Sequence, residues 1–235
     1  TSPLSSKAYV DITIEVLKGY GIEIVENPDG YFVKGNQKFK GNYEVEGDWS
    51  NMAFFLVLGA LSDRVCVSGL NLKSVQGDKK IMGILSLFGA NVAFNKNQIL
   101  VAKNKMNAFT FDGDECPDLV PIVAVLAGFA KGKSVIKNVQ RLKLKESDRI
   151  ASTLAMLKAF NIEGSFNGND IEIIGGTPQG ATVHSFNDHR IVMASAVMGL
   201  VASGKTTILD SQAVDKSYPT FFKDYVSLGG KVSEN

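Results

Sequence analysis

The chain has 235 residues, of which 45% are hydrophobic and 21% are charged, and its formal net charge is +1. This composition is typical of a globular protein with one or two domains. The near-neutral charge argues against a surface that binds nucleic acid or membranes. Two cysteines and two histidines argue against a disulfide framework and a zinc site. The apolar runs are too short to span a bilayer and no signal peptide is visible, which predicts a cytoplasmic protein.

The first 46 residues predict a helix followed by strands. The stretch TSPLSSKAYVDITIEVL enters a helical pattern almost at once and has no initiator Met, so we expect a chain that begins within a longer protein. Gly21 stands where a helix C-cap is expected, and YFVKG at 31–35 has the composition of a strand. The segment GNYEVEGD at 41–48 is the expected crossing between two domains.

From about residue 47 the sequence repeats. Asp48, Asp118 and Asp188 are spaced 70 residues apart, and each precedes an apolar stretch rich in small residues. Asp accepts hydrogen bonds from the unpaired N–H groups of a first helical turn, so each is expected to cap a helix that starts at or near it. The three helices are apolar on nearly every side, which predicts that they are buried.

Each of these helices is followed by a β-branched run, a second helix and further strands. The runs DRVCVSGL, GKSVIKNV and GKTTILDS predict strands, as do QILVAK and DIEIIGG. The second helices end in a shared pattern with a C-cap residue at Gly89, Asn161 and Gly229. The unit is therefore helix–strand–helix–strand–strand and occurs three times, and the first 46 residues match the back half of another unit.

Three equivalent buried helices in one domain are expected to pack side by side and roughly parallel, so that their N-termini emerge together. Each N-terminus carries about half a positive charge and unpaired N–H groups. Three that point at one place form an anion site without a basic surface. This prediction fits a nearly neutral protein with an anionic substrate.

The stretch GLVASGKT at 199–206 matches the nucleotide-binding loop pattern G-x-x-x-x-G-K-[ST]. A phosphate-binding loop of this kind follows a strand and precedes a helix. Here the predicted helix comes first and the predicted strand follows. We therefore interpret the stretch as a helix-to-strand turn and not as an ATP site.

Charged residues gather at predicted helix entries. RLKLKESDRI at 141–150 reads either as a solvated helix start, capped by Ser147 or Asp148, or as charges held for chemistry. Arg190 lies just inside a buried helix, where it opposes the helix dipole. Its position is better explained if the guanidinium faces a bound carboxylate or phosphate, which it pairs bidentately.

Several motifs together resemble one family. They are SKAYVDIT at 6–13, EGDWSNMAFFLV at 46–57, PDLVPIVAVLA at 117–127, KESDRI at 145–150 and NDHRIVMA at 187–194. Through them the chain resembles the 5-enolpyruvylshikimate-3-phosphate synthase (3-phosphoshikimate 1-carboxyvinyltransferase) family over essentially its whole length. Members of that family are nearly twice as long, and this chain is similar to their C-terminal part.

The resemblance implies an α/β (α+β) protein with the enolpyruvyl transferase fold, in which repeated βαβαββ units with buried parallel helices build two similar domains. Residues 1–46 are then a remnant of the last repeat unit of the N-terminal domain, and residues 47–235 form a C-terminal domain of three repeat units. The missing N-terminal domain is the expected partner. We expect a monomer that binds neither nucleic acid nor membranes.

The resemblance also implies a reaction. The enolpyruvyl group of phosphoenolpyruvate is transferred to the 5-hydroxyl of shikimate 3-phosphate and phosphate is released, in the shikimate pathway to chorismate and the aromatic amino acids. Both substrates are small anions, and no metal or organic cofactor is expected. We expect the chain alone to be inactive, because the cations of the N-terminal domain are missing.

Roles follow residue by residue where the motifs match. Asp118 corresponds to the carboxylate that takes the proton of the attacking hydroxyl, and Glu146 to the acid that protonates the enol methylene, with Lys145 beside them as a site lysine. The residues expected to bind shikimate 3-phosphate are Ser6, Tyr9, Asp118 and Lys145. The residues expected to bind phosphoenolpyruvate are Arg149, Arg190 and Lys216.

Two alternatives remain open at this point. The first is the sister enzyme with the same fold, UDP-N-acetylglucosamine enolpyruvyltransferase, which relies on a cysteine outside the matched region. Cys116 cannot replace that cysteine because it precedes a buried helix, and KESDR and NDHR favour the shikimate enzyme. The second is a folded half-protein without catalytic activity.

Overall fold

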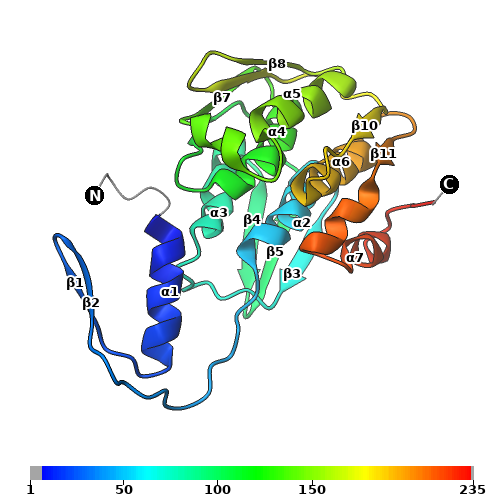
Figure 1. Ribbon diagram of the computed structural model, residues 1–235. Helices are drawn as coiled ribbons and strands as arrows, with labels where there is room; N and C mark the ends of the chain where they lie inside the picture. The colour runs from blue at the N-terminus through cyan, green and yellow to red at the C-terminus, as the bar shows by residue number, and fades with distance from the viewer. Residues whose placement is uncertain (1–6, 234–235) are drawn as a thin grey trace.

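The computed structural model describes residues 7–233 and shows a mixed α/β protein (Figure 1). Ser6, a residue expected to bind shikimate 3-phosphate, lies outside the described residues. The α-helices are α1 (Lys7–Gly19), α2 (Trp49–Leu61), α3 (Ile81–Phe88), α4 (Val120–Gly128), α5 (Arg149–Ala159), α6 (His189–Val201) and α7 (Phe221–Ser227). Short 3₁₀ helices are η1 (Gly77–Lys80), η2 (Pro117–Leu119), η3 (Gln140–Leu144) and η4 (Ser211–Lys216).

The strands pair into small sheets. They are β1 (Ile24–Asn27), β2 (Gly30–Val33), β3 (Val65–Ser68), β4 (Asn91–Asn95), β5 (Gln98–Ala102), β6 (Thr110–Asp112), β7 (Lys133–Lys137), β8 (Glu163–Phe166), β9 (Ile171–Ile174), β10 (Thr182–His184) and β11 (Thr207–Leu209). One sheet has the order β6-β7-β9-β8, in which Val135 of β7 faces Thr110 on its parallel neighbour and Glu172 on its antiparallel one. The order β3-β5-β4 forms an antiparallel sheet, β10 pairs in parallel with β11, and β1 and β2 form a hairpin. The strands predicted after the apolar helices are confirmed as β3, β7 and β11.

The capping prediction holds for two of the three repeated aspartates. Asp48 accepts from the backbone N–H groups of Ser50 and Asn51 at 2.8 and 3.3 Å and caps α2. Asp188 accepts from the N–H of Arg190 at 2.9 Å and caps α6. Asp118 lies inside η2, and α4 begins after it without a side-chain cap, so the expectation for this residue was wrong. The intervening 3₁₀ turn leaves its carboxylate available for other partners.

The predicted helix C-cap residues adopt the left-handed backbone conformation. The φ angles of Gly21, Gly89, Asn161 and Gly229 are +77°, +85°, +62° and +95°. Glycine has no Cβ to clash in this conformation, and Asn tolerates it better than most residues. The pattern seen in the sequence is therefore a local backbone requirement, and it ends each helix at the expected place.

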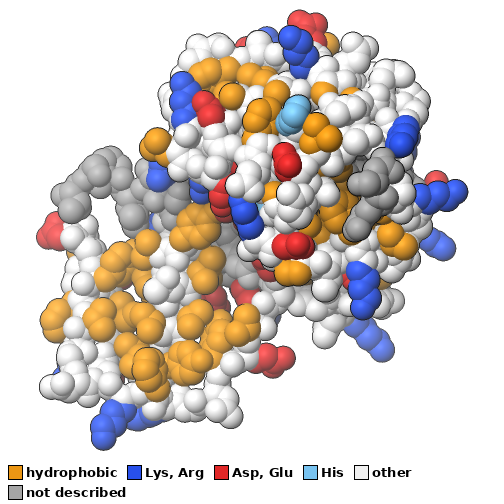
Figure 2. Space-filling model, turned by 45° about the vertical axis from the view of Figure 1, so that its right-hand side comes forward, with side chains coloured by type: hydrophobic (Ala, Val, Ile, Leu, Met, Phe, Trp, Pro, Cys, Tyr) orange, Lys and Arg blue, Asp and Glu red, His pale blue; other side chains and the backbone are white. Residues whose placement is uncertain are grey.

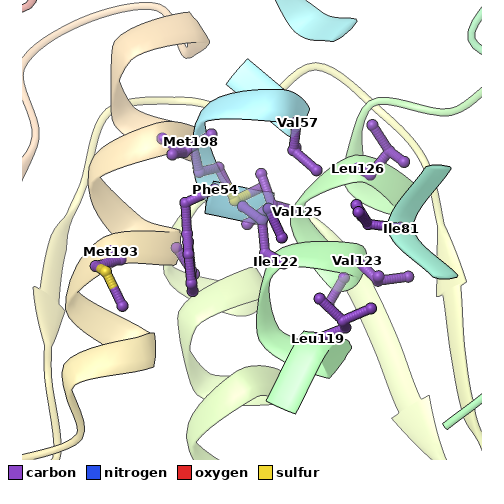
Figure 3. Close-up of a cluster of buried hydrophobic side chains, with 14 of the residues drawn as sticks. Phe54, Val57, Ile81, Leu119, Ile122, Val123, Val125, Leu126, Met193 and Met198 are labelled. Carbon is purple, nitrogen blue, oxygen red and sulfur yellow. The ribbon is translucent and has the colours of Figure 1, made fainter. Parts of the chain in front are cut away.

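The core lies where α2, α4 and α6 contact one another (Figure 3). Phe54 and Val57 of α2, Ile122 of α4 and Met193 and Met198 of α6 all point into this cluster. Burying each such side chain stabilises the fold by about 1.5–3 kcal/mol relative to leaving it exposed. Because these helices are apolar all round, they are covered on every side, as their composition predicts.

The stretch at 199–206 is a helix-to-strand turn, as predicted. Helix α6 ends at Val201 and β11 begins at Thr207, with Gly204 in the left-handed conformation at a φ of +97°. A phosphate-binding loop needs the opposite order, with the helix N-terminus facing the phosphate. The stretch therefore matches the nucleotide-binding pattern in sequence but not in structure.

The N-terminal elements form a lobe beside this core, at lower left in Figure 1. Helix α1 has no buried residue, and hydrophobic side chains gather over the lobe in Figure 2. The large exposed hydrophobic residues of this part of the chain are Tyr9, Val25, Tyr31, Phe32, Val33, Phe39 and Val45. No helix in the described part of the chain has the length and apolar character needed to cross a membrane.

The segment 34–48 joins this lobe to α2 without helix or strand of its own. Its end is fixed by side chains: Glu46 Oε1 accepts from Ser74 Oγ at 2.5 Å and from Gln76 Nε2 at 2.7 Å. Gln76 Oε1 in turn accepts from the N–H of Trp49 at 2.9 Å. The start of α2 is thereby tied to the point where the chain leaves the lobe.

Candidate active site

Asp118 is the centre of a cluster of polar side chains. Its Oδ2 accepts from the hydroxyl of Tyr9 at 2.7 Å and lies 3.2 Å from Nη2 of Arg190. Its Oδ1 accepts from Nη1 of Arg149 at 2.7 Å and lies 3.4 Å from Nζ of Lys145. The partners come from α1, α5, α6 and the turn before α5, so tertiary folding brings together residues that the sequence motifs predicted separately.

These partners shift the pKa values of the acid groups. Burial raises the pKa of a carboxyl group, but for Asp118 the charges of Arg190, Lys145 and Arg149 and the hydrogen bond from Tyr9 hold the pKa well below its ordinary value. Burial and the neighbouring charge of Asp118 raise the pKa of Tyr9 well above its ordinary value. Asp118 is therefore an ionised acceptor and Tyr9 a neutral donor.

Arg149 is fully buried and is held on three sides by carboxylates. Its Nε donates to Asp188 Oδ2 at 2.8 Å, its Nη1 to Asp118, and its Nη2 to Glu146. Burial opposes the charged form, but the hydrogen bond and charge of Asp188 and the charges of Asp118 and Glu146 raise the pKa of Arg149. The guanidinium therefore stays charged in the core, since each of its edges has an anionic partner.

Arg190 joins the first turns of the three central helices. Its Nη1 donates to Ser50 Oγ at 2.6 Å and to the carbonyl oxygen of Asp118 at 3.3 Å. Ser50 lies in the first turn of α2, Asp118 just before α4, and Arg190 in the first turn of α6. The N-terminal ends of the three helices therefore meet, as the repeat predicted, and they concentrate N–H groups and positive partial charge at one place.

The charged decapeptide at 141–150 divides into two groups. Lys145, Glu146 and Arg149 lie at the cluster, and Lys145 Nζ also lies 6.0 Å from the centre of the Tyr9 ring. Asp148 caps α5 by accepting from the N–H groups of the next turn at 3.1 Å. Both interpretations of this stretch are therefore partly right: Asp148 caps the helix, and the charged residues on either side of it lie at the cluster.

Lys216 stands apart from the cluster. Its Nζ donates to the carbonyl oxygen of Asn187 at 2.7 Å, immediately before α6. Ser217, beside it, lies 3.4 Å from the side chain of Asn51 in the first turn of α2. Lys216 thus lies at the same end of the helices, but no contact joins it to Asp118 in the structure as described.

Three residues at this place were not predicted as site residues. Asp188 was read only as a helix cap, yet its carboxylate is fully buried and also holds Arg149. Ser50 was missed because a serine in a helical first turn carries no distinctive signal. Asp78 was missed because a single acidic residue in a polar stretch carries no distinctive signal either, although it is buried beside the cluster.

A pocket of about 220 Å³ opens between α1 and the helix N-termini. It is lined by Ala8, Tyr9, Ile12, Asp48, Ser50, Gln76, Gly77, Asp78, Glu115, Asp118 and Arg190. Within residues 7–233, no group of three His, Cys, Asp or Glu side chains is placed to hold a metal ion. Buried cations, converging helix N-termini and an adjoining pocket are typical of α/β proteins that bind small anions.

The comparisons with known proteins define the family. A family model described as EPSP synthase (3-phosphoshikimate 1-carboxyvinyltransferase) matches residues 1–225. The chain therefore belongs to the EPSP synthase family.

Similar proteins carry the same description. The chain is 46% identical to a 3-phosphoshikimate 1-carboxyvinyltransferase of Pyrococcus abyssi, over 93% of this chain and 53% of the relative. It is 43% identical to one of Clostridium novyi, over 100% of this chain and 54% of the relative. The chain thus spans about half the length of the curated relatives it matches.

Solved structures agree on the fold. The EPSP synthase of Acinetobacter baumannii superposes with a TM-score of 0.83 at 26% identity, over 94% of this chain and 55% of that one. The enolpyruvyl transferase NikO from Streptomyces tendae superposes with a TM-score of 0.79 at 16% identity, over 96% of this chain and 54% of that one, and shows a likeness of fold.

Proposed function

We propose that the protein to which this chain belongs transfers the enolpyruvyl group of phosphoenolpyruvate to the 5-hydroxyl of shikimate 3-phosphate and releases phosphate. The observation that carries this proposal is the cluster around Asp118, in which a carboxylate, a phenol and three cations meet at converging helix N-termini. Family membership supplies the substrates, and the cluster supplies groups suited to them. The relatives are about twice as long, so the activity belongs to the whole protein and not to this chain alone.

The finer architecture is part of the same proposal. The order β6–α4–β7–α5–β8–β9 corresponds to one βαβαββ unit of the enolpyruvyl transferase fold. The third repeat departs from the expected pattern, because no strand follows α7 within residues 7–233. Residues 47–235 are still proposed to form a domain of three related units, and residues 1–46 to belong to the preceding domain. The exposed apolar lobe formed by α1, β1 and β2 supports this division, because it lacks the cover that a complete unit has.

Asp118 is proposed to accept the proton of the attacking hydroxyl. In the absence of substrate its depressed pKa makes it a weak base, because three cations and Tyr9 stabilise its charge. When the carboxylate and phosphates of the substrates bind beside these cations, that stabilisation is shared between Asp118 and the substrates. The basicity of Asp118 then rises at the moment when a hydroxyl is in place to be deprotonated.

Glu146 is proposed to protonate the methylene carbon of phosphoenolpyruvate while the sugar oxygen bonds to the adjacent carbon. The side chain contacts Arg149 and is 43% exposed, so a ligand bound beside the cluster can reach it. Arg149, Arg190 and Lys216 are proposed to hold phosphoenolpyruvate. Tyr9 and Lys145 are proposed to hold shikimate 3-phosphate, together with Asp118, and Ser6 completes this set by resemblance.

Phosphate release measured with both substrates tests the proposal. The chain alone is expected to show negligible turnover, and the chain joined to the preceding half of the same protein is expected to release phosphate. Replacing shikimate 3-phosphate with UDP-N-acetylglucosamine is expected to abolish turnover. The assignment would be overturned if the complete protein released phosphate with UDP-N-acetylglucosamine but not with shikimate 3-phosphate. It would also be overturned if the complete protein released no phosphate with either acceptor.

A further inference from the structure

Lys216 is held by a single hydrogen bond, although the proposed function gives it a substrate to bind. Its Nζ donates to the carbonyl oxygen of Asn187 at 2.7 Å, and the residue is exposed. Within residues 7–233 the ammonium contacts no carboxylate. An ammonium has three N–H donors, so two of them remain available to an anion. The hydrogen bond to Asn187 therefore determines where this cation is presented.

The turn before α6 has an uncommon backbone conformation. Phe186 and Asn187 have φ angles of +53° and +56°, in the left-handed region. Asn tolerates this region, whereas a bulky residue such as Phe seldom adopts it. Such a conformation persists only where the surrounding structure holds it. Contacts from outside these two residues must therefore stabilise the turn.

Ser185 makes those contacts. It is fully buried, and its carbonyl oxygen accepts from the N–H of Asp188 at 3.0 Å. Its Oγ accepts from the N–H of Asn187 at 3.1 Å and donates to the carbonyl oxygen of Asp210 at 3.2 Å. A backbone N–H can only donate and a carbonyl oxygen can only accept. The chemistry of these partners therefore fixes the direction of the single hydroxyl proton.

Both sides of the Lys216 hydrogen bond depend on Ser185. The peptide unit that joins Asn187 to Asp188 is planar and trans, so its N–H and C=O point in opposite directions. Because the N–H is directed at the Ser185 carbonyl, the C=O of Asn187 is directed away from it, toward Lys216. Asp210, the other partner of the hydroxyl, immediately precedes η4, which ends at Lys216. Ser185 thus holds the acceptor and the start of the element that carries the donor.

We propose that Ser185 is a positioning residue for Lys216. Its hydroxyl stabilises the turn whose Asn187 carbonyl keeps the ammonium at the N-terminal end of α6, where the anionic substrate is proposed to bind. The identity of that substrate as phosphoenolpyruvate rests on the proposed function, whereas the positioning of Lys216 does not. A lysine side chain is flexible, and restraining it before the ligand arrives lowers the entropy cost of binding. Loss of the hydroxyl is therefore expected to weaken binding without removing a group that touches substrate.

The first test reads the hydrogen bond between Lys216 and Asn187 directly, in this chain without substrate. The carbonyl ¹³C chemical shift of Asn187 responds to a bound donor, and Lys216→Met removes the donor, so this substitution is expected to shift the signal. In a Ser185→Ala background the same substitution is expected to shift it by less than half as much, because the turn no longer holds the lysine. Ser195→Ala is the matched control background, since this buried serine has no hydrogen-bond partner among the described residues and should leave the effect of Lys216→Met unchanged.

A second measurement needs no substitution at Ser185. Because the amide of Asn187 donates to a buried hydroxyl, its exchange with solvent in the unsubstituted chain is expected to be slow. Exchange at the rate of an unprotected amide would show that the turn is not held by Ser185 and would overturn the proposal.

The third test measures binding to the complete protein. Ser185→Ala is expected to raise the Kd for phosphoenolpyruvate about tenfold, which corresponds to the net contribution of one hydrogen bond. The Kd for shikimate 3-phosphate is expected to stay within about twofold. Because Ser185 acts through Lys216, adding Ser185→Ala to Lys216→Met is expected to weaken phosphoenolpyruvate binding no further.

The outcomes are separable. If Lys216→Met shifts the Asn187 signal equally in the parent chain and in Ser185→Ala, the positioning role is wrong. Additive losses of affinity in the double variant, or equal losses for both substrates, would also overturn it, since they would indicate an effect on the fold and not on Lys216. Absence of phosphoenolpyruvate binding by the unsubstituted complete protein would instead count against the proposed function and leave the two NMR measurements intact.

Discussion

Asp118 and Asp78 lie in one pocket, yet their surroundings shift their pKa values in opposite directions. Asp118 is contacted directly by cations, which favour its charged form, whereas Asp78 is buried and has two other carboxylates, Asp118 and Asp48, nearby. A carboxyl group with a depressed pKa stabilises the folded protein when ionised, and one with a raised pKa destabilises it. Each residue therefore predicts its own dependence of stability on pH.

For Asp118, the folded pKa lies below the unfolded one. Its contribution to stability is therefore fully present above the unfolded value of 3.8 and is lost as the pH falls through the folded pKa. Asp118→Asn is expected to lower the free energy of unfolding by roughly 2–4 kcal/mol at pH 7, because Arg149 is left buried with fewer anionic partners. Urea unfolding checks this, and the gap between variant and parent should narrow below pH 4. An equal gap at pH 3 and pH 7 would contradict the assignment.

For Asp78 the sign is reversed. Its pKa rises from 3.8 to about 6 in the folded protein, so its contribution is most favourable below pH 4 and is lost as the pH rises through 6. Asp78→Asn keeps the shape of the side chain and removes the buried charge. We expect it to raise the free energy of unfolding by roughly 1–2 kcal/mol at pH 7.5 and by little at pH 4. Urea unfolding at both pH values measures this, and a variant that is less stable at pH 7.5 would refute it.

At the level of elements, small residues let the central helices approach their neighbours. A Cβ added at Gly59 of α2 would lie 2.8 Å from the carbonyl oxygen of Val101 and 3.1 Å from the Cβ of Val65. Backbone atoms of β5 cannot move aside as the end of a flexible side chain can. Gly59 is therefore a packing requirement at this position.

Gly59→Ala is expected to lower the free energy of unfolding by roughly 1–3 kcal/mol, the usual cost of overpacking a core. Gly83→Ala on α3 is the matched control, because a Cβ there meets no atom within 4 Å. That variant is expected to gain roughly 0.5–1 kcal/mol from the higher helix propensity of alanine. Thermal or urea unfolding distinguishes the two, and similar effects of both substitutions would refute the packing argument.

At the level of the whole molecule, the lobe formed by α1, β1 and β2 presents an uncovered apolar surface. Phe32 is 60% exposed and Phe39 is 73% exposed, in a segment with no buried helix residue. Apolar patches on this scale usually mark interaction sites. The curated relatives are about twice as long, which makes the other half of the protein the proposed occupant.

Phe32→Asp is therefore expected to leave the stability of this chain within about 0.5 kcal/mol, and to weaken its association with the separately produced preceding half at least tenfold. Leu87→Asp on α3, at a side chain 55% exposed, is the control and should have no effect on association. Calorimetric titration of the two halves measures both. Equal affinities for the two variants would place the interface elsewhere.

The sequence by itself determined the helices, the strands that follow them, the helix ends and the meeting of the helix N-termini. These features depend on interactions within a few residues, such as the capping by Asp48 and the left-handed Gly89, and on a repeat that makes equivalent helices pack equivalently. The KESDRI and NDHR motifs also identified the family, and they named most of the residues around Asp118.

Only the tertiary structure decided how those residues are partnered. Tyr9 reaches Asp118 across 109 positions and Arg190 reaches Ser50 across 140, and no local pattern records such a contact. The same holds for Asp78, an ordinary surface residue by sequence that folding places beside a buried arginine. Short-range hydrogen bonds determine where helices begin and end. Charge pairing in the core depends instead on which distant segments pack against one another and bury the same site.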